Sequence, residues 1–255
     1  MSRVTIVVTN HLKENEKYLD LALLGIQNQT YTNWHCVVIS DAETMPLMPF
    51  DSRFTLHHDP YIGNATNKAH YAVDNLVPED SDLILFHSDD VFMSEDCVKN
   101  MVKYHEPQAK PVIINPCSNS DLGSRFAFPM YLMNESNEHI MLHPDMSWED
   151  ICPKWIKEVG KYSPGFQLLG VQDYVSFYCT MIPKEHFKAI GRIDARLDVR
   201  HNDEDYCIRA RQRGIIPVIS FDAFALHFGS KTLYKAHSGE EFNEATKVFK
   251  EKWGR

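Results

Sequence analysis

The first forty residues alternate between two β-branched runs and one amphipathic stretch, and this pattern constrains the fold most. Every residue from 4 to 8 is β-branched, which predicts a buried central strand, and residues 34–39 predict a second one. Between them, residues 16–27 carry leucine and isoleucine at helical spacing. Two strands that flank one helix form a βαβ unit, whose strands pair in parallel through a right-handed crossover. We therefore predict an α/β fold with a mixed, mostly parallel central sheet flanked by helices.

The same alternation continues through the rest of the first half of the chain. Further strands are predicted at residues 54–57, 83–86 and 111–115, and helices at residues 63–75 and 94–104, with Ser94 as the N-cap of the latter. In the second half we predict a strand at residues 173–182, a short helix that ends at Gly191, a helix at residues 206–213, strands at residues 215–220 and 223–226, and a helix at residues 240–253.

Residues 116–172 differ in character from the segments on either side. They are rich in Pro, Asn, Ser and Met, and their only helical periodicity lies at residues 147–159. Segments of this kind often supply lids or substrate walls, and a packed irregular connector is the other interpretation. Neither an internal repeat nor a linker stands out, so we predict a single domain over residues 1–255.

Composition and charge restrict the class of protein. The chain has 255 residues and a formal net charge of −9, which argues against a grip on duplex DNA. No apolar run approaches the roughly 20 residues of a membrane span, and residues 1–3 lead directly into a strand without a signal peptide. The six cysteines are scattered along the chain, and their spacing matches neither a zinc site nor a disulfide framework. These features predict a cytoplasmic protein.

An acidic pair follows the buried strand at residues 83–86. Asp89 and Asp90 would stand at the carboxyl end of that strand, which is where open α/β sheets hold their ligands. Adjacent carboxylates repel unless a cation or hydrogen-bond donors lie between them. A divalent cation that also contacts phosphates fits this position. The alternative is a polar loop in which Asp90 caps the next helix.

Several landmarks occur in a fixed order along the chain. A first strand ends in Thr9 and Asn10, a second ends in Ser-Asp, a Gly-x-Ala-x-Asn element follows at residues 63–67, and the third landmark strand ends in the acidic pair. An acidic cluster at residues 201–205 precedes an Arg-x-Arg helix, and a lone histidine, His227, follows a late strand. In this order they resemble the GT-A glycosyltransferases, specifically the large inverting family 2, over residues 4–232 and most weakly at residues 116–172.

The resemblance implies which residues bind the donor, a nucleoside-diphosphate sugar. Residues 1–115 would form the nucleotide-sugar-binding half, and residues 116–255 the acceptor-binding and catalytic half. The donor would contact residues at strand ends, on one helix and near residue 232, where the resemblance ends. These residues are Thr9, Asn10, Asp41, Asn67, Lys68, His87, Ser88, Asp89 and Lys231. The alternatives are a turn-forming role for Asp41 and a solvated position for Lys68.

The metal motif of the family departs from its usual form in this chain. Its Asp-x-Asp maps onto residues 87–89, so that His87 replaces the first aspartate. Asp89 keeps the metal-binding role, and His87 contacts the nucleotide or packs in the core. The resemblance implies His227 as the second protein ligand of Mn²⁺ or Mg²⁺, and imidazole suits Mn²⁺ better. The alternative for His227 is a packed or solvated side chain.

The acidic cluster supplies the candidate catalytic base. A gapless count back from the Arg-x-Arg helix places Asp203 on the position of the family's base, with Glu204 in reserve. An inverting transfer needs a carboxylate that takes the proton of the acceptor hydroxyl. The other interpretation is a cluster of N-capping residues.

These residues predict a metal-dependent glycosyltransferase that uses a nucleoside-diphosphate sugar, UDP-linked in our interpretation, and inverts the anomeric centre. The acceptor would be a saccharide, a lipid-linked glycan or another hydroxyl, and the net charge disfavours a nucleic acid. One alternative is a nucleotidyltransferase, but residues 9–13 lack the Gly-rich, basic phosphate loop of that class. The other is a non-catalytic nucleotide-sugar-binding module, which the His87 replacement favours.

Overall fold

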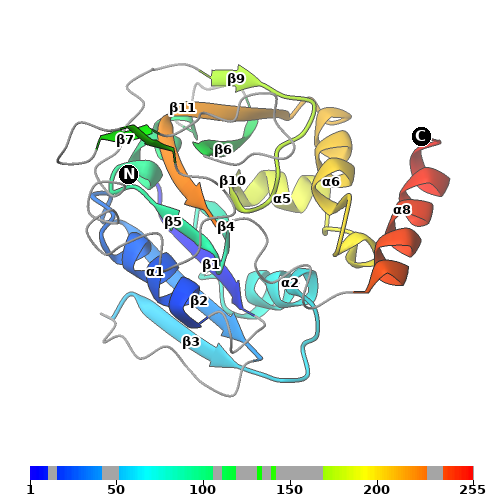
Figure 1. The fold of residues 1–255 in the computed structure, drawn as a ribbon, viewed down its shortest axis with the longest axis horizontal. Coiled ribbons are helices and arrows are strands. Elements are labelled where there is room, and N and C mark those ends of the chain that lie inside the picture. The colour runs from blue at the N-terminus through cyan, green and yellow to red at the C-terminus, as the bar shows by residue number, and fades with distance from the viewer. Residues whose placement is uncertain are drawn as a thin grey trace.

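Strands and helices alternate along the first part of the chain, as the sequence predicts (Figure 1). The computed structural model describes residues 1–10, 16–41, 52–105, 111–118, 131–133, 139–141, 169–228 and 238–254. The described strands are β1 (Val4–Asn10), β2 (Trp34–Ser40), β3 (Phe54–His58), β4 (Leu83–Ser88), β5 (Val91–Met93), β6 (Val112–Ser118), β7 (Tyr131–Met133), β8 (His139–Met141), β9 (Leu169–Val171), β10 (Cys179–Pro183) and β11 (Ile216–His227). The described helices are α1 (Glu16–Gln27), α2 (Ala65–Asn75), α3 (Cys97–Val102), α5 (Lys184–Ile190), α6 (Asn202–Arg211) and α8 (Gly239–Trp253), with 3₁₀ turns η2 (Lys103–His105) and η3 (Ala195–Leu197).

One mixed sheet collects most of these strands. Its strand order is β3-β2-β1-β4-β10-β6-β11-β5. A further strand, β9, pairs with β11 outside this order. The pairs β2–β3, β1–β2, β1–β4 and β6–β11 are parallel, whereas β4–β10, β6–β10, β5–β11 and β9–β11 are antiparallel. The predicted α/β fold with a mixed sheet is confirmed, and its antiparallel pairs all involve strands of the second half or the short β5.

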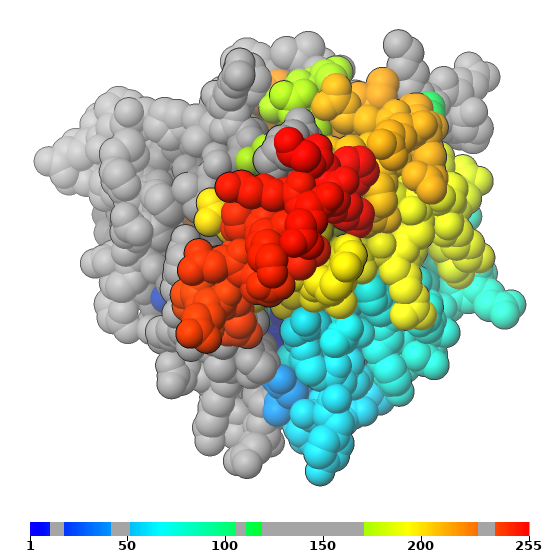
Figure 2. All heavy atoms as spheres, turned by 90° about the vertical axis from the view of Figure 1, so that its right-hand side faces the viewer, coloured from blue at the N-terminus to red at the C-terminus, as the bar shows by residue number. Residues whose placement is uncertain are grey.

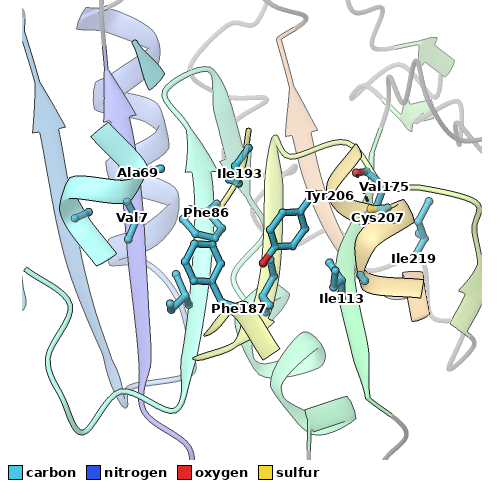
Figure 3. Packing of buried hydrophobic residues seen from close by; sticks show 14 of the residues in the cluster. Val7, Ala69, Phe86, Ile113, Val175, Phe187, Ile193, Tyr206, Cys207 and Ile219 are labelled. Atoms are coloured by element: carbon cyan, nitrogen blue, oxygen red, sulfur yellow. Dashed lines mark hydrogen bonds between the residues drawn. The ribbon is translucent and has the colours of Figure 1, made fainter. Parts of the chain in front are cut away.

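Helices cover both faces of the sheet and enclose two apolar clusters. On one face, α2, α5 and α6 contribute Ala69, Phe187 and Tyr206 to a cluster that includes Phe86 of β4. Figure 3 shows the rings of Phe86, Phe187 and Tyr206 side by side between the sheet and these helices. On the other face, α1 and α3 pack against the side chains of β1, β2 and β4. Both clusters leave the carboxyl ends of β1, β2 and β4 for polar residues.

Two predictions in the first half are corrected by long-range contacts. The helix predicted at residues 94–104 begins at Cys97 and passes into the 3₁₀ turn η2, and its N-cap is Asp96 rather than Ser94. The Ser94 hydroxyl instead donates to the carbonyl of Phe224, 130 residues later. Ahead of this helix lies β5, a strand without a local sequence signal, which exists because it pairs with β11.

Three predictions in the second half are also corrected. The strand predicted at residues 173–182 is confined to β10, which begins at Cys179. The helix predicted at residues 206–213 begins at Asn202, so the acidic cluster forms its first turn. Residues 216–227 form one strand, β11, with an irregular register between Ser220 and Phe224, rather than two strands. The helix predicted at residues 147–159 lies outside the described residues.

Candidate functional site

The carboxyl ends of three parallel strands bring the first group of polar residues together. In the register of β1 with β2, Asn10 lies opposite Ser40, and in the register of β1 with β4, Thr9 lies opposite Ser88. Asp89 follows Ser88 directly, so it stands at the same sheet edge. The predicted gathering of donor-site residues at this edge therefore follows from the strand register itself.

Asn10 links the ends of β1, β2 and β4 by hydrogen bonds. Its Nδ2 atom donates to Asp89 Oδ2 at 2.9 Å, and its Oδ1 atom accepts from the Ser40 hydroxyl at 2.7 Å. Each of the three residues has an exposed fraction of 4% or less. A buried carboxylate is costly unless donors reach it, so the hydrogen bond from Asn10 offsets part of the cost of burying Asp89 and fixes its position.

Lys68 adds a buried cation to this edge. It lies on α2 with no exposed surface, and its Nζ atom donates to the Asn10 carbonyl at 2.9 Å. The same atom lies 2.9 Å from Asp41 Oδ2. Burial lowers the pKa of Lys68, while its hydrogen bond to Asp41 and the charges of Asp41, Asp89 and Asp198 act in the opposite direction. Lys68 thus holds Asp41 and the end of β1 together.

Asn67, the neighbouring predicted donor residue, points elsewhere. Its side chain is exposed, and its backbone N–H donates to Asn64 Oδ1, the N-cap of α2. Asn67 is therefore separate from the buried network of Asn10, Ser40, Asp41, Lys68 and Asp89, which we call the strand-end network.

A second polar group surrounds His227 at the end of β11. Because β11 is antiparallel to β5, His227 lies opposite Val91, next to the acidic pair. His227 Nε2 is 3.4 Å from Asp90 Oδ1, and the His227 ring stacks on Tyr178 at a centroid distance of 5.0 Å and an interplanar angle of 14°. Tyr178 is anchored in turn, since its carbonyl accepts from the Ser88 N–H at 2.9 Å. The carboxylate described beside His227 is that of Asp90, whereas Asp89 faces Asn10.

The donor set around His227 suits a divalent cation. Two ligands at right angles, each about 2.1 Å from a cation, lie about 3 Å apart, near the 3.4 Å between His227 Nε2 and Asp90 Oδ1. A nitrogen and carboxylate oxygens are ligands that Mn²⁺ accepts. Within the described ranges, three or more such side chains do not converge on one point. A cation here would therefore depend on phosphate oxygens or water for its remaining ligands.

His87 is buried beside this second group. It has an exposed fraction of 3%, and within the described part of the chain neither ring nitrogen has a hydrogen-bond partner of normal geometry. Burial lowers the pKa of His87 to about 4, against the opposing charge of Asp90. His87 is therefore a neutral imidazole at physiological pH, whereas the resemblance noted in the sequence implies an ionised aspartate at this position.

The candidate base lies on α6. Asp203 and Glu204 occupy the first turn of that helix, and the Asp203 carboxylate accepts from the backbone N–H of Glu204 at 2.7 Å. Burial raises the pKa of Asp203 to about 6, and the charge of Glu204 acts in the same direction. The described hydrogen bonds of Asp203 are local to this turn. Lys231, the remaining predicted donor residue, lies outside the described residues.

Sequence reasoning missed two parts of this arrangement. It named Asp90 as part of an acidic pair or as a helix cap but did not pair it with His227, and it left Tyr178 unmentioned as a partner of His227. Both depend on β5 and β10, whose pairing with distant strands gives no local signal. A signal was present for Ser40, because it ends a strand directly before Asp41.

The comparisons with known proteins find likeness in structure alone. No protein-family model matches the sequence, and no curated protein matches it. TarS from S. aureus superposes with a TM-score of 0.55 at 13% identity, over 96% of this chain and 38% of that one. GalNAc-T7, solved with UDP, GalNAc and Mn²⁺, gives a TM-score of 0.61 at 9% identity, over 89% of this chain and 44% of that one.

A third similar structure also holds a donor and a metal. The mannosyltransferase PcManGT from Pyrobaculum calidifontis, in complex with GDP-Man and Mn²⁺, gives a TM-score of 0.58 at 12% identity, over 97% of this chain and 64% of that one. The chain thus spans between 38% and 64% of the length of these three solved chains. Taken together, the strand order, the polar sheet edge and these superpositions give the chain the GT-A fold of nucleotide-sugar glycosyltransferases.

Proposed function

We propose that the protein is a glycosyltransferase that moves a sugar from a nucleoside-diphosphate sugar to an acceptor hydroxyl with inversion. The observation that carries this proposal is the strand-end network, a set of buried polar and charged side chains at the carboxyl edge of a GT-A sheet. Buried polar networks of this kind are expensive to maintain and commonly serve a binding site. We propose one domain over residues 1–255, with the donor in the half formed by residues 1–115.

The donor half contains groups suited to a nucleotide. Asp41 has a side chain with 12% exposure, and Lys68 holds it in place, so that one carboxylate edge can accept hydrogen bonds from a base. TarS and GalNAc-T7 have been solved with UDP, and PcManGT with GDP-Man. We propose a UDP-linked donor, with Thr9, Asn10 and Ser88 lining the path from the base to the phosphates.

A divalent cation, Mn²⁺ or Mg²⁺, would be held by His227 together with the acidic pair. Asp90 Oδ1 lies 3.4 Å from His227 Nε2, and Asp89 Oδ2 accepts a hydrogen bond from Asn10 Nδ2. When bound, the cation would neutralise charge that develops on the departing diphosphate. Lys231 remains a candidate donor to that diphosphate.

Asp203 is our candidate for the general base. Its pKa of about 6 leaves the carboxylate ionised at neutral pH and still basic enough to take a proton. In the proposed step, Asp203 takes the proton of the acceptor hydroxyl while the hydroxyl oxygen bonds to the anomeric carbon. The bond from that carbon to the diphosphate oxygen breaks on the opposite face, so the anomeric centre inverts. Only one carboxylate is needed, in contrast to the two of glycosidases.

A non-catalytic module that binds nucleotide sugars is the second candidate, and His87 favours it. A neutral, buried imidazole in place of an aspartate lowers the negative charge available for a cation. The two candidates differ in one measurable outcome, which is turnover.

The experiment is release of nucleoside diphosphate from a panel of UDP- and GDP-sugars in the presence of Mn²⁺ and candidate acceptors. We expect turnover with a UDP-sugar that is lost in Asp89→Ala, Asp90→Ala and Asp203→Asn, with each variant folded by circular dichroism. Retained donor binding in Asp203→Asn would separate the base from the donor site. Donor binding without turnover in the wild type would favour the module. Full activity in Asp203→Asn with loss in Glu204→Gln would move the base to Glu204.

A further inference from the structure

The C-terminal helix α8 packs against the segment that leads into α6. Ala245 and Phe249 of α8 form a small apolar cluster with Leu197 of η3, apart from the two main clusters. Figure 2 shows α8, in orange to red, lying across the yellow surface that immediately precedes α6. A capping box between Ser238 and Glu241 fixes the start of α8. The contact surface of α8 thus faces η3, the turn that precedes α6.

Asp205 anchors the far end of α8 to α6. This aspartate has no exposed surface, and its two oxygens have separate partners. Oδ1 accepts from Trp253 Nε1 at 2.9 Å and lies 2.7 Å from Lys252 Nζ, and Oδ2 accepts from Arg209 Nε at 2.9 Å. A buried carboxylate with one cation from each of two helices ties these helices together, because loss of either cation leaves the buried charge only partly compensated.

His201 connects α8 to Glu204, the neighbour of the candidate base. It is the N-cap of α6 and, among the described residues other than glycine, it alone has a positive φ, at 66°. Its ring stacks on Phe249 of α8 at a centroid distance of 4.5 Å and an interplanar angle of 16°. Its Nδ1 atom lies 3.1 Å from Glu204 Oε2. A left-handed conformation in a non-glycine residue persists where surrounding contacts hold it, and here those contacts come from α8 and from Glu204.

We propose that His201, held by Phe249 of α8, positions the first turn of α6 by drawing Glu204 aside, so that Asp203 is the carboxylate presented to the acceptor. This inference rests on the proposed glycosyl transfer and adds to it a positioning residue and a role for α8. Asp203 and Glu204 are adjacent, and the backbone N–H of Glu204 donates to Asp203 Oδ1. The placement of Glu204 therefore sets the orientation of Asp203 as well. Displacement of a catalytic group by about 1 Å can cost about a hundredfold in rate.

The test uses two substitutions at His201 that both accept a left-handed backbone. Glycine removes the ring, whereas asparagine keeps a side-chain donor that can reach Glu204. We expect His201→Gly to lower kcat about tenfold or more with the KM for the UDP-sugar within about twofold of wild type. We expect His201→Asn to recover at least about a third of the wild-type kcat by the same reasoning. A purely structural role would not separate these two variants in this way.

Variants on α8 complete the test. Phe249→Leu removes the stack but leaves the His201 donor, so it should lower kcat by less than His201→Gly does, whereas Lys247→Ala, a change at a residue on α8 whose side chain is 64% exposed, should leave kcat unchanged. Wild-type kcat in His201→Gly, or equal losses in the glycine and asparagine variants, would overturn the inference. The proposed function fails by a different result, which is an inactive wild-type protein or a fully active Asp203→Asn.

Discussion

Lys68 is a buried cation that forms an ion pair with Asp41. The two charged groups are 2.9 Å apart, and Lys68 has no exposed surface while the Asp41 side chain keeps 12%. Removing one member of a buried pair leaves the other charge uncompensated. We therefore expect Lys68→Met to lower the free energy of unfolding by about 2–3 kcal/mol, less than for a fully buried pair because Asp41 retains some contact with water. Urea denaturation measures this loss.

Lys99 provides the matched control for that substitution. It pairs with Asp96 at 3.3 Å, but its side chain is 59% exposed. Exposed pairs contribute little, so Lys99→Met should change the free energy of unfolding by less than about 1 kcal/mol. Equal losses in the two variants would mean that Lys68 is not stabilised by its buried partners.

Asp203 carries a stability cost that comes from its proposed role. Burial raises its pKa to about 6, above the value of 3.8 for an unperturbed aspartate. The folded state therefore holds this proton more tightly than the unfolded state, so the contribution to stability is full below about pH 4, falls as pH rises to about 6, and stays low above that. We expect Asp203→Asn to raise the free energy of unfolding by about 1–2 kcal/mol at pH 7.5, a value reduced for its partial exposure.

The same substitution should have little effect on stability at pH 4, where Asp203 is protonated in the folded protein. Denaturant titrations of wild type and Asp203→Asn at the two pH values test the sign directly. A loss of stability at pH 7.5 would contradict a desolvated, ionised Asp203 and would assign this carboxylate a stabilising helix-capping role instead.

The pKa of Asp203 also predicts the pH dependence of transfer. A general base must be ionised, so kcat/KM should fall about tenfold for each pH unit below about 6 and level off above it. The acidic limb should be absent from the residual activity of Asp203→Asn. A limb that persists unchanged in that variant would show that another group titrates.

At the scale of whole elements, local periodicity predicted most of the helices and strands. The predicted limits of α1 are those observed, because its apolar residues repeat at helical spacing and face the sheet. The strands of the βαβ unit also follow from their β-branched composition. Elements that exist through distant partners were missed: β5 has three residues and pairs with β11, and Ser94 bonds Phe224 in place of capping α3.

In the candidate site, too, features with a local sequence signal could be predicted and features that depend on distant partners could not. Residues directly at strand ends, such as Asn10 and Asp89, could be predicted because parallel strands share one carboxyl edge. The burial of Lys68 and the pairing of Asp90 with His227 could not, since each joins residues that are far apart in sequence. The role of α8 at the start of α6 likewise depends on contacts across about fifty residues, such as Trp253 with Asp205.

The close packing of α1 on β5 predicts the effect of a substitution at Gly25. A Cβ atom at Gly25 would lie 2.9 Å from the backbone nitrogen of Met93 and 3.2 Å from its carbonyl oxygen. Backbone atoms of a paired strand cannot move aside cheaply, so we expect Gly25→Ala to lower the free energy of unfolding by about 1–3 kcal/mol despite the better helix propensity of alanine.

Gly239, the first residue of α8, is the control for this change. A Cβ atom there would meet nothing within 4 Å. Gly239→Ala should leave the free energy of unfolding unchanged or raise it by up to about 1 kcal/mol. Thermal or urea unfolding of the two alanine variants under one condition compares them. A neutral Gly25→Ala would mean that α1 can shift away from β5 without loss.

At the scale of the whole molecule, the proposed donor is an anionic ligand for an acidic protein. The chain carries a formal net charge of −9, and the proposed donor adds a diphosphate beside Asp89 and Asp90. Like charges at this distance disfavour binding unless a cation lies between them. Donor and cation should therefore bind with positive coupling, each raising the affinity for the other.

Among the described helices, none combines the length and hydrophobicity that crossing a bilayer requires.

The expected coupling between donor and cation predicts how these ligands change thermal stability. UDP with Mn²⁺, at about a hundred times its dissociation constant, should raise the Tm by about 5–10 °C, because binding at that excess stabilises the folded state by about 2.7 kcal/mol. UDP with EDTA, or Mn²⁺ alone, should give a much smaller shift. His227→Ala should abolish the extra shift of the pair, whereas His186→Ala, a change on α5, should retain it. An equal shift by UDP with EDTA and with Mn²⁺ would contradict a cation bound between the acidic pair and the diphosphate.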